Sequence, residues 1–374
     1  MIMKKTIILW LCLFTLFGCE RVNKDANAFK YNIPIENIKE TVGYEDLIDT
    51  LTYIALEKNE NAIIGDIKDL IVANNKIYVS DNNGVYVFDI NGKHLYSINR
   101  KGHSKSEFTF INSINISDNI LFLYDNSQNK LLCFDAQDGK FINSIVLPWR
   151  AGKVYGDRNY LYVDFAGWPT DIAPNGERIA VVNKDNIEKA DFAVFDDEEF
   201  KIPIDGTCKL MSDGIAMTSY YNCKIWIVNS DGVHSYINIE RASDKIMTKE
   251  MLNEMISNHH LSKNDDSPYI YGLSNVCETN KNITGRMFCG NNAFNFVFNK
   301  QSNKVVCYKQ VLYNNSQFYL PPAITSDDEY CYSVLSSVEI DYIKDTEQSQ
   351  SLSFPKTIDS DGNPIIIQYR FKMR

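Results

Sequence analysis

The sequence lacks nearly every short motif that marks a common enzyme or metal site. Its 374 residues include only five histidines, and none of them has the His-x-x-x-His or His-Glu spacing of a metal site. It contains no Gly-x-Ser-x-Gly nucleophile elbow, no P-loop and no dinucleotide-binding glycine fingerprint. The segment Asp359 to Gly362 looks like a calcium loop but lacks the twelve-residue spacing and the terminal Glu, so a hairpin turn explains it better. Local motifs therefore predict no catalytic, cofactor-binding or metal-binding residue.

A basic stripe is also missing. The chain carries 38 basic and 48 acidic residues, a net charge of −10, and its longest charged run, Asp196 to Glu199, is acidic. Nucleic-acid phosphates are bound by clustered Lys and Arg, so we expect no nucleic-acid partner. No Pro- or Ser-rich linker divides the chain, and all-β folds often exceed the usual domain length, so we expect a single folded domain.

Only the N-terminus carries a signal for targeting. Lys4 and Lys5 precede an apolar run over residues 7–17, which is too short for a spanning helix of about 20 apolar residues. This order of basic, apolar and small residues is typical of a secretory signal peptide. Its ending, Leu16-Phe17-Gly18-Cys19, resembles the lipobox of bacterial lipoproteins, whose cysteine is acylated. An ordinary signal peptide with a chance cysteine is the alternative.

The N-terminal signal predicts three segments. Residues 1–18 are expected to be a lipoprotein signal peptide, residues 19–37 a lipidated tether and residues 38–374 the folded domain. Two or three acyl chains on Cys19 would anchor the protein stably, because a single chain binds a membrane only marginally. The membrane is thus an expected partner, and the expected location is the cell envelope, at the periplasmic or surface face of the outer membrane.

Cysteine usage favours thiols over disulfides. Of the nine cysteines, Cys12 lies in the signal peptide and Cys19 takes lipid, which leaves an odd number and no Cys-x-x-Cys zinc spacing. Cys133, Cys223 and Cys307 lie within apolar runs, where free cysteine behaves as a small buried hydrophobe. We expect buried thiols, with at least one disulfide as the alternative, since an exported chain can form them.

The strongest positive signal is a repeated phrase. Residues 85–98 read VYVFDINGKHLYSI and residues 131–145 read LLCFDAQDGKFINSI. Each has a run of β-formers, an Asp, a turn ending in Gly-Lys and a second β run. The two aspartates, Asp89 and Asp135, are 46 residues apart, which matches the period of a four-stranded propeller blade, about 40–50 residues.

The repeat predicts an all-β fold, a six-bladed β-propeller with four-stranded blades. Strand runs bounded by Asn, Asp and Gly turns place the starts of the blades near residues 66, 113, 153, 208, 269 and 318. The sixth blade takes residues 318–340 and the terminal strand 364–371, which is well placed to complete a blade begun near the N-terminus and so close the ring. One short helical insertion, Thr248 to Leu261, is expected between blades four and five because its apolar residues share one face.

Three phrases carry a resemblance to a known family. Residues 64–81 (IGDIKDLIVANNKIYVSD), residues 85–98 and the C-terminal NPIIIQYRFK resemble six-bladed β-propeller lipoproteins of Gram-negative bacteria, with NHL-like or TolB-like architecture. The resemblance covers roughly residues 40–374 and implies fold and envelope location, without a general catalytic motif. Members usually carry Arg-Lys-Gly-x-Gly-Pro-Gly-Glu-Tyr after blade one. Residues 100–108 read RKGHSKSEF here, so the role of that loop does not carry over.

Three classes of function remain open. The first is a non-enzymatic, monomeric binding module, anchored in the envelope, that presents one face to a glycan, a peptide or an envelope protein. The alternative is a lyase or hydrolase acting on glycans or peptides, with residues from several blades meeting in the central channel. A purely structural role in an envelope complex is a third. Carboxylates, His and Arg gathered at the channel would favour the enzyme, whereas an exposed apolar patch would favour a protein partner.

Aromatic residues beside turns are the candidate contacts for a ligand. Trp149, Trp168 and Tyr220-Tyr221 lie in such places. Of these, Trp168, which Pro169 follows in an expected loop, could stack on a sugar or contact a protein, although packing between blades is the simpler role.

Overall fold

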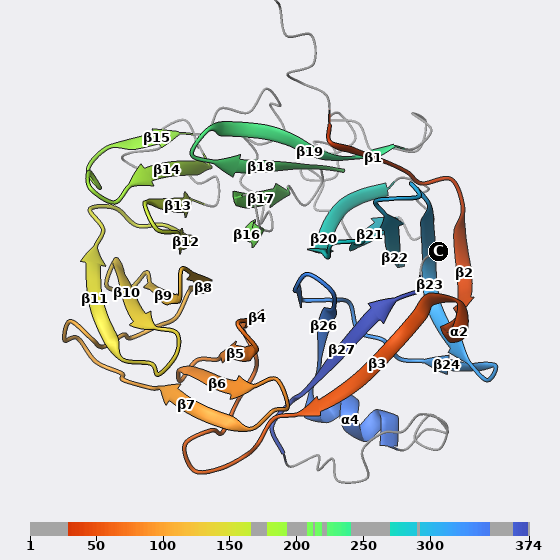
Figure 1. Cartoon of the computed structure of the whole chain (residues 1–374), viewed down its shortest axis with the longest axis horizontal. Coiled ribbons are helices and arrows are strands. Elements are labelled where there is room, and N and C mark those ends of the chain that lie inside the picture. The colour runs from red at the N-terminus through yellow and green to blue at the C-terminus, as the bar shows by residue number, and fades with distance from the viewer. Residues whose placement is uncertain are drawn as a thin grey trace, which may run out of the picture.

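Six sheets, antiparallel except for one parallel pair in each of two sheets, are arranged as blades around a common axis (Figure 1). This computed structural model describes residues 29–165, 178–192, 208–211, 214–218, 223–240, 270–289, 292–344 and 362–372. The prediction of a six-bladed β-propeller with four-stranded blades is confirmed, and two blades gain further strands. The predicted helix Thr248 to Leu261 lies outside the described residues.

The first three blades follow the sequence repeat, with strands paired in chain order from the axis outward. Their middle strands are almost entirely buried, because both faces of a blade pack against neighbouring blades. This is why KIYVS and VYVFD are apolar throughout rather than alternating with polar residues. The strands are β4 (Asp69–Ala73), β5 (Lys76–Ser80), β6 (Val85–Asp89) and β7 (His94–Ile98); β8 (Ser113–Ser117), β9 (Ile120–Asp125), β10 (Lys130–Asp135) and β11 (Phe141–Val146); and β12 (Lys153–Gly156), β13 (Tyr160–Asp164), β14 (Ile179–Asn183) and β15 (Ala190–Phe192).

Blades four and five are each extended at the outer edge by an N-terminal strand. β1 (Tyr31–Pro34) pairs in parallel with β19, and β2 (Ile38–Gly43) pairs in parallel with β23. Blade four contains β16 (Cys208–Met211), β17 (Gly214–Thr218), β18 (Lys224–Asn229) and β19 (Gly232–Glu240); blade five contains β20 (Ile270–Glu278), β21 (Asn282–Cys289), β22 (Asn292–Asn299), β23 (Val305–Tyr313) and the short β24 (Ser316–Phe318).

The position of β1 changes the expected boundary of the tether. Residues 31–34 fall within the segment 19–37 that the sequence assigns to the tether, yet they form part of the propeller. Ile33 is fully buried there, and the ring of Tyr31 lies 5.6 Å from that of Tyr236. Burial of these apolar groups favours a strand over a solvated tether.

Blade six joins the two ends of the chain. It contains β25 (Thr325–Ser326), β26 (Cys331–Leu335) and β27 (Ile365–Phe371), with β3 (Ile48–Ala55) as its outermost strand. β3 and β27 run side by side (Figure 1), in register from Ile365 opposite Ala55 to Phe371 opposite Ile48. The terminal strand therefore closes the ring, as predicted.

Two short helices occur in the described residues, and the sequence predicts neither. They are α2 (Tyr44–Leu47) and α4 (Ser337–Lys344). The assignment of residues 318–340 to the strands of blade six is wrong at its end, where α4 begins. A capping box explains this: Glu339 N donates to Ser336 Oγ at 3.3 Å, and Ser336 N donates to Glu339 Oε2 at 2.8 Å.

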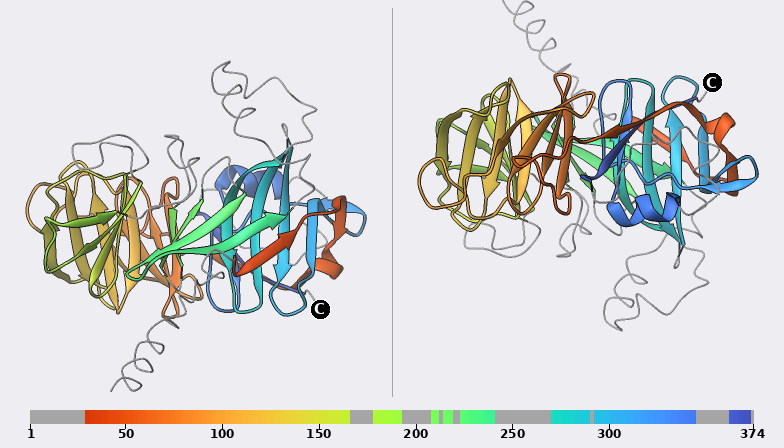
Figure 2. Two further views of the ribbon diagram at one scale, coloured as in Figure 1. Left: turned by 90° about the horizontal axis from the view of Figure 1, so that it is seen from above. Right: turned by 90° about the horizontal axis from the view of Figure 1, so that it is seen from below.

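Edge-on, the propeller is a flat disc with α4 on one face (Figure 2). Its apolar cores lie between adjacent blades. Six cysteines have described side chains; all six are thiols rather than disulfides, and five of them are buried. This agrees with the expectation of buried thiols for those five.

Candidate functional site: the central channel

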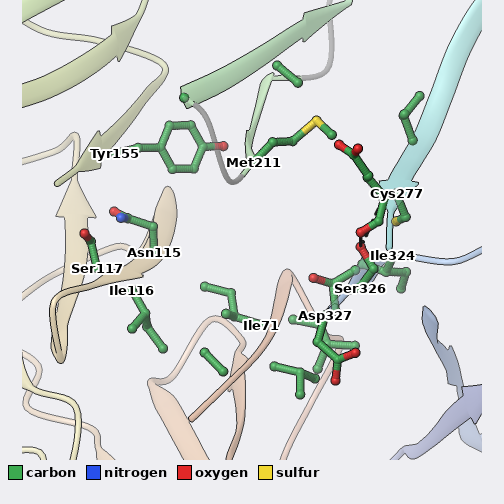
Figure 3. Close-up of a pocket in the computed structure, with 18 of the residues that line it drawn as sticks. Ile71, Asn115, Ile116, Ser117, Tyr155, Met211, Cys277, Ile324, Ser326 and Asp327 are labelled. Carbon is green, nitrogen blue, oxygen red and sulfur yellow. Dashed lines mark hydrogen bonds between the residues drawn. The ribbon is translucent and has the colours of Figure 1, made fainter. Parts of the chain in front are cut away.

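The axis of the propeller contains a cavity of about 900 Å³. Inner strands or inner turns of all six blades line it, and a close-up shows side chains converging on it from several blades (Figure 3). Typical small-molecule sites have volumes of about 300–1,000 Å³. The channel is therefore large enough for a small molecule or a short oligomer.

Much of the channel wall is apolar. Along β4, residues 69, 71 and 73 are half-buried while residues 70 and 72 are buried in the blade, because side chains of a strand alternate between its two faces. Ile71, Ile116, Met211 and Tyr155 project inward from blades one to four (Figure 3).

One end of the channel is acidic. The first and second strands of each blade are joined at the same end of the channel, since every first strand runs in the same direction along the axis. Asp157 follows the inner strand of blade three, Glu278 ends that of blade five, and Asp327 and Asp328 follow that of blade six. Lys300 lines the same end. These five residues are called the acidic mouth below.

Asp157 and Asp327 are held by the same local pattern. Residues 157–162 (DRNYLY) and 327–332 (DDEYCY) share Asp-x-x-Tyr-x-Tyr. In both, the carboxylate accepts the backbone N–H groups two and three residues onward, at 2.8 and 2.7 Å. It also accepts a tyrosine hydroxyl, from Tyr162 at 2.8 Å and from Tyr332 at 2.5 Å. Burial and these carboxylates raise the pKa of both tyrosines, so the hydroxyls stay protonated donors.

Glu278 connects three blades at the acidic mouth. Its Oε1 pairs with Lys300 Nζ at 2.9 Å, and its Oε2 accepts the hydroxyl of Tyr236, in blade four, at 2.5 Å. Its backbone N donates to Ser326 Oγ of blade six at 3.1 Å. Both charged side chains are about 15% exposed, so the pair is a fixed part of the wall.

The opposite end of the channel contains Asp69 and Lys153, at the starts of β4 and β12. Burial raises the pKa of Asp69, and the charge of Lys153 and the backbone N–H of Ile114 offset part of that rise. A carboxyl with a raised pKa in a cavity is a feature of many acid–base sites. The charged groups that act on Asp69 are Lys153 and Lys68, and both lower its pKa.

Of the aromatic residues singled out beside turns, Trp149 is the one that the structure describes, and it does not line this cavity. Trp149 is buried and packs edge-on against Phe165 at 5.7 Å, so its role is packing. Trp168, Tyr220, Tyr221 and the lipidation candidate Cys19 lie outside the described residues. Among the residues that are described, no group of three or more His, Cys, Asp or Glu is placed to hold a metal ion.

The loop of residues 100–108 is fastened to blade two. Lys130 Nζ donates to the backbone oxygens of Ser104 at 2.8 Å and Glu107 at 2.5 Å. Gln128 Nε2 donates to the backbone oxygen of Gly102 at 2.9 Å. Blade two therefore holds this loop, although the loop lacks the later glycines and the proline found in the family that the sequence resembles.

A second aspartate that repeats from blade to blade was not predicted from the sequence. Asp125 and Asp164 end the second strands of blades two and three, Asp81 directly follows that of blade one, and all three are buried. Asp81 and Asp125 accept backbone N–H groups of the loop entering the blade, from Gly65 at 2.9 Å and Thr109 at 2.6 Å. The recurring sequences YVSD, FLYD and LYVD contain these aspartates and could have indicated the repeat. Asp81 and Asp125 thus hold the loops that enter their blades, Asp164 pairs with Arg178, and none of the three lines the channel.

The fold and the cavity define a class: a six-bladed propeller with a ligand-sized axial channel. Residues 30–370 match the model of a family described as a domain of unknown function, DUF4934, and the chain belongs to that family. No curated protein matches the chain.

Two solved structures share the fold. A putative exported protein from Bacteroides fragilis is 17% identical, with a TM-score of 0.72 over 92% of this chain and 100% of that one. A member of the duf4221 family from Bacteroides vulgatus is 10% identical, with a TM-score of 0.50 over 88% of this chain and 98% of that one. At such identities these similarities show the fold alone.

Proposed function

We propose that the protein is a cell-envelope binding module whose central channel takes a small or short oligomeric ligand. The observation that carries this proposal is the 900 Å³ cavity, lined by all six blades. Its wall combines apolar side chains with polar groups already held by hydrogen bonds, which is the usual composition of a preformed ligand site. Binding then costs little reordering of the wall.

The proposal includes a lipid anchor at Cys19. The Leu-Phe-Gly-Cys ending supports it, and the fold similarity to a putative exported protein is in keeping with an envelope location. No helix within the described ranges is long and apolar enough to cross a membrane. Eleven residues separate Cys19 from Tyr31, where β1 begins. Fully extended, they reach about 40 Å, so the propeller would stay close to the bilayer surface.

The channel is tested by ligand-dependent stability. The full chain, purified in mild detergent, is melted with glycans, peptides and divalent metals, because a ligand that binds only the folded state raises the melting temperature. The variant Ser117→Trp places a large ring in the channel and should abolish the shift. Asn143→Trp, on the exposed outer strand β11, is the matched control and should keep it.

Two other results would redirect the proposal. A shift that persists unchanged in Ser117→Trp would place the ligand outside the channel and refute the site. Chemical turnover of the bound ligand would favour the lyase or hydrolase alternative.

A further inference from the structure

We infer that the channel ligand carries a primary ammonium group on a hydrocarbon stem and binds with the ammonium at the acidic mouth. This inference rests on the proposed channel site and adds the chemical class of its ligand. Three observations carry it: the charge balance of the mouth, the apolar wall beside it, and the absence of a metal-binding cluster in the described part of the chain.

The acidic mouth has carboxylates without a neutralising partner. Glu278 is paired with Lys300 at 2.9 Å, and Lys184 Nζ donates to the backbone oxygen of Asp157. Asp327 accepts only neutral donors, two backbone N–H groups and the Tyr332 hydroxyl. The side chain of Asp328 is exposed and makes no hydrogen bond or ion pair with the described residues.

The arginine that pairs with the neighbouring Glu329 forms no ion pair with Asp327 or Asp328 among the described residues. Arg370 pairs with Asp49 at 2.7 Å and also with Glu329, and it does not line the channel. Asp327 and Asp328 therefore keep two negative charges at a cavity rim. A concave site with walls of low polarity concentrates the potential of such charges and attracts cations.

The apolar wall indicates an organic cation. A hydrated metal ion would leave Ile71, Ile116 and Met211 exposed to water, whereas a hydrocarbon stem would cover them. Burial of apolar surface stabilises a complex by about 25 cal/mol per Å². The described carboxylates also form no cluster of three or more metal-ligand groups. An ammonium donates up to three hydrogen bonds to carboxylates and needs no such cluster.

Two sources share this chemistry, a free polyamine and a lysine side chain of a peptide. The probes are spermidine, the peptide acetyl-Ala-Lys-Ala-amide, and the same peptide with its lysine Nε-acetylated. Binding to the full chain in detergent is measured by calorimetry at low ionic strength, where exposed charges are least screened. We expect at least one amine probe to bind and the acetylated peptide to bind at least tenfold more weakly. Spermidine binding alone would identify a free polyamine, and peptide binding alone a peptide.

The double variant Asp327→Asn with Asp328→Asn removes the charges and preserves side-chain shape, including the acceptor oxygen that holds the turn. It should weaken binding of the amine probe at least tenfold. Glu60→Gln with Glu188→Gln removes two charges from exposed sites off the channel and should change affinity less than twofold. The inference would be overturned if the aspartate variant bound the amine probe as tightly as the wild type does. It would also be overturned if the acetylated peptide bound as tightly as the unmodified peptide, or if neither amine probe bound at all.

Failure of the inference is distinguishable from failure of the channel site. A neutral ligand that binds the wild-type chain and is lost in Ser117→Trp would overturn the ammonium group and leave the site standing. Ligand binding that survives Ser117→Trp would refute both.

Discussion

At the scale of single residues, buried aspartates hold the loops that enter the blades. The side chain of Asp125 accepts Thr109 N at 2.6 Å, and also bonds Ser127 N at 2.9 Å and Gln128 Nε2 at 2.9 Å. One carboxylate thus connects the loop before blade two with the turn after β9. Removing it would leave several backbone N–H groups without an acceptor, and unsatisfied buried donors are costly.

The variant Asp125→Ala should lower the free energy of unfolding by about 3 kcal/mol at neutral pH, because hydrogen bonds to a charged group are among the stronger ones. Burial by itself raises the pKa of Asp125, but hydrogen bonds from Thr109 and Gln128 outweigh burial and lower it. A carboxyl with a lowered native pKa stabilises the fold above its unfolded pKa, and this contribution is lost as pH falls through the native pKa. The difference in free energy of unfolding between wild type and variant should therefore decrease as pH falls from about 5 to about 2.

Urea unfolding at several pH values measures this difference. Asp191→Ala is the control, because that side chain is 75% exposed and its ion pair within the described part of the chain is with the similarly exposed Lys189, and such surface pairs contribute little. A variant at Asp125 as stable as the wild type at pH 7 would contradict the assigned role.

At the scale of elements, β3 determines whether the ring is closed. Its Ile54 is buried and lies opposite Ile366 of β27. The turn between β6 and β7 also packs directly on β3: Glu57 N donates to Gly92 O at 2.8 Å, and a Cβ on Gly92 would lie 2.2 Å from Ala55 O. Gly92 has a φ of +87°, so glycine is required there by both conformation and space.

Ile54→Ala should lower the free energy of unfolding by about 2–4 kcal/mol, through lost burial and the cavity left behind. Because β3 is paired to the rest of blade six only through β27, amide hydrogen exchange in β27 should also become faster. Thr52→Ala, exposed on the same strand, should change stability by less than about 0.5 kcal/mol. Unchanged exchange in β27 of the Ile54 variant would show that β3 is not the closing strand.

At the scale of the whole molecule, the proposed anchor residue Cys19 and the N-terminal strands belong to one continuous segment. β1, β2 and β3 pair successively with blades four, five and six, and Cys19 precedes them. A lipid on Cys19 would thus attach the membrane to the outer rim of the disc, rather than to the channel.

The full chain expressed in a Gram-negative host should incorporate a labelled fatty acid and sediment with membranes. Cys19→Ser should abolish the label, because the acyl chains have no other attachment site in this proposal. Cys12→Ser, inside the expected signal peptide, should keep it. Label retained in Cys19→Ser would refute the anchor.

The sequence by itself determined the number and the internal order of the blades. Turns such as Asn91-Gly92 and Asp138-Gly139 join strands that are adjacent in the chain, so hairpin pairing depends on local residues and leaves a readable pattern. The second repeated aspartate also lies in a local pattern, because YVSD and FLYD lie at the ends of equivalent strands, so it could have been recognised from the sequence.

Only the tertiary structure decided what meets at the axis and at the rim. Asp157 and Asp327 are 170 residues apart, and each belongs to a turn whose local pattern indicates a hairpin and nothing about a shared cavity. The pairing of β1 with β19 joins residues about 200 positions apart and likewise leaves no local pattern. Such contacts are set by ring closure, which brings all six inner strands to one axis. The fold was therefore largely predictable, whereas the acidic mouth and the outer N-terminal strands were not.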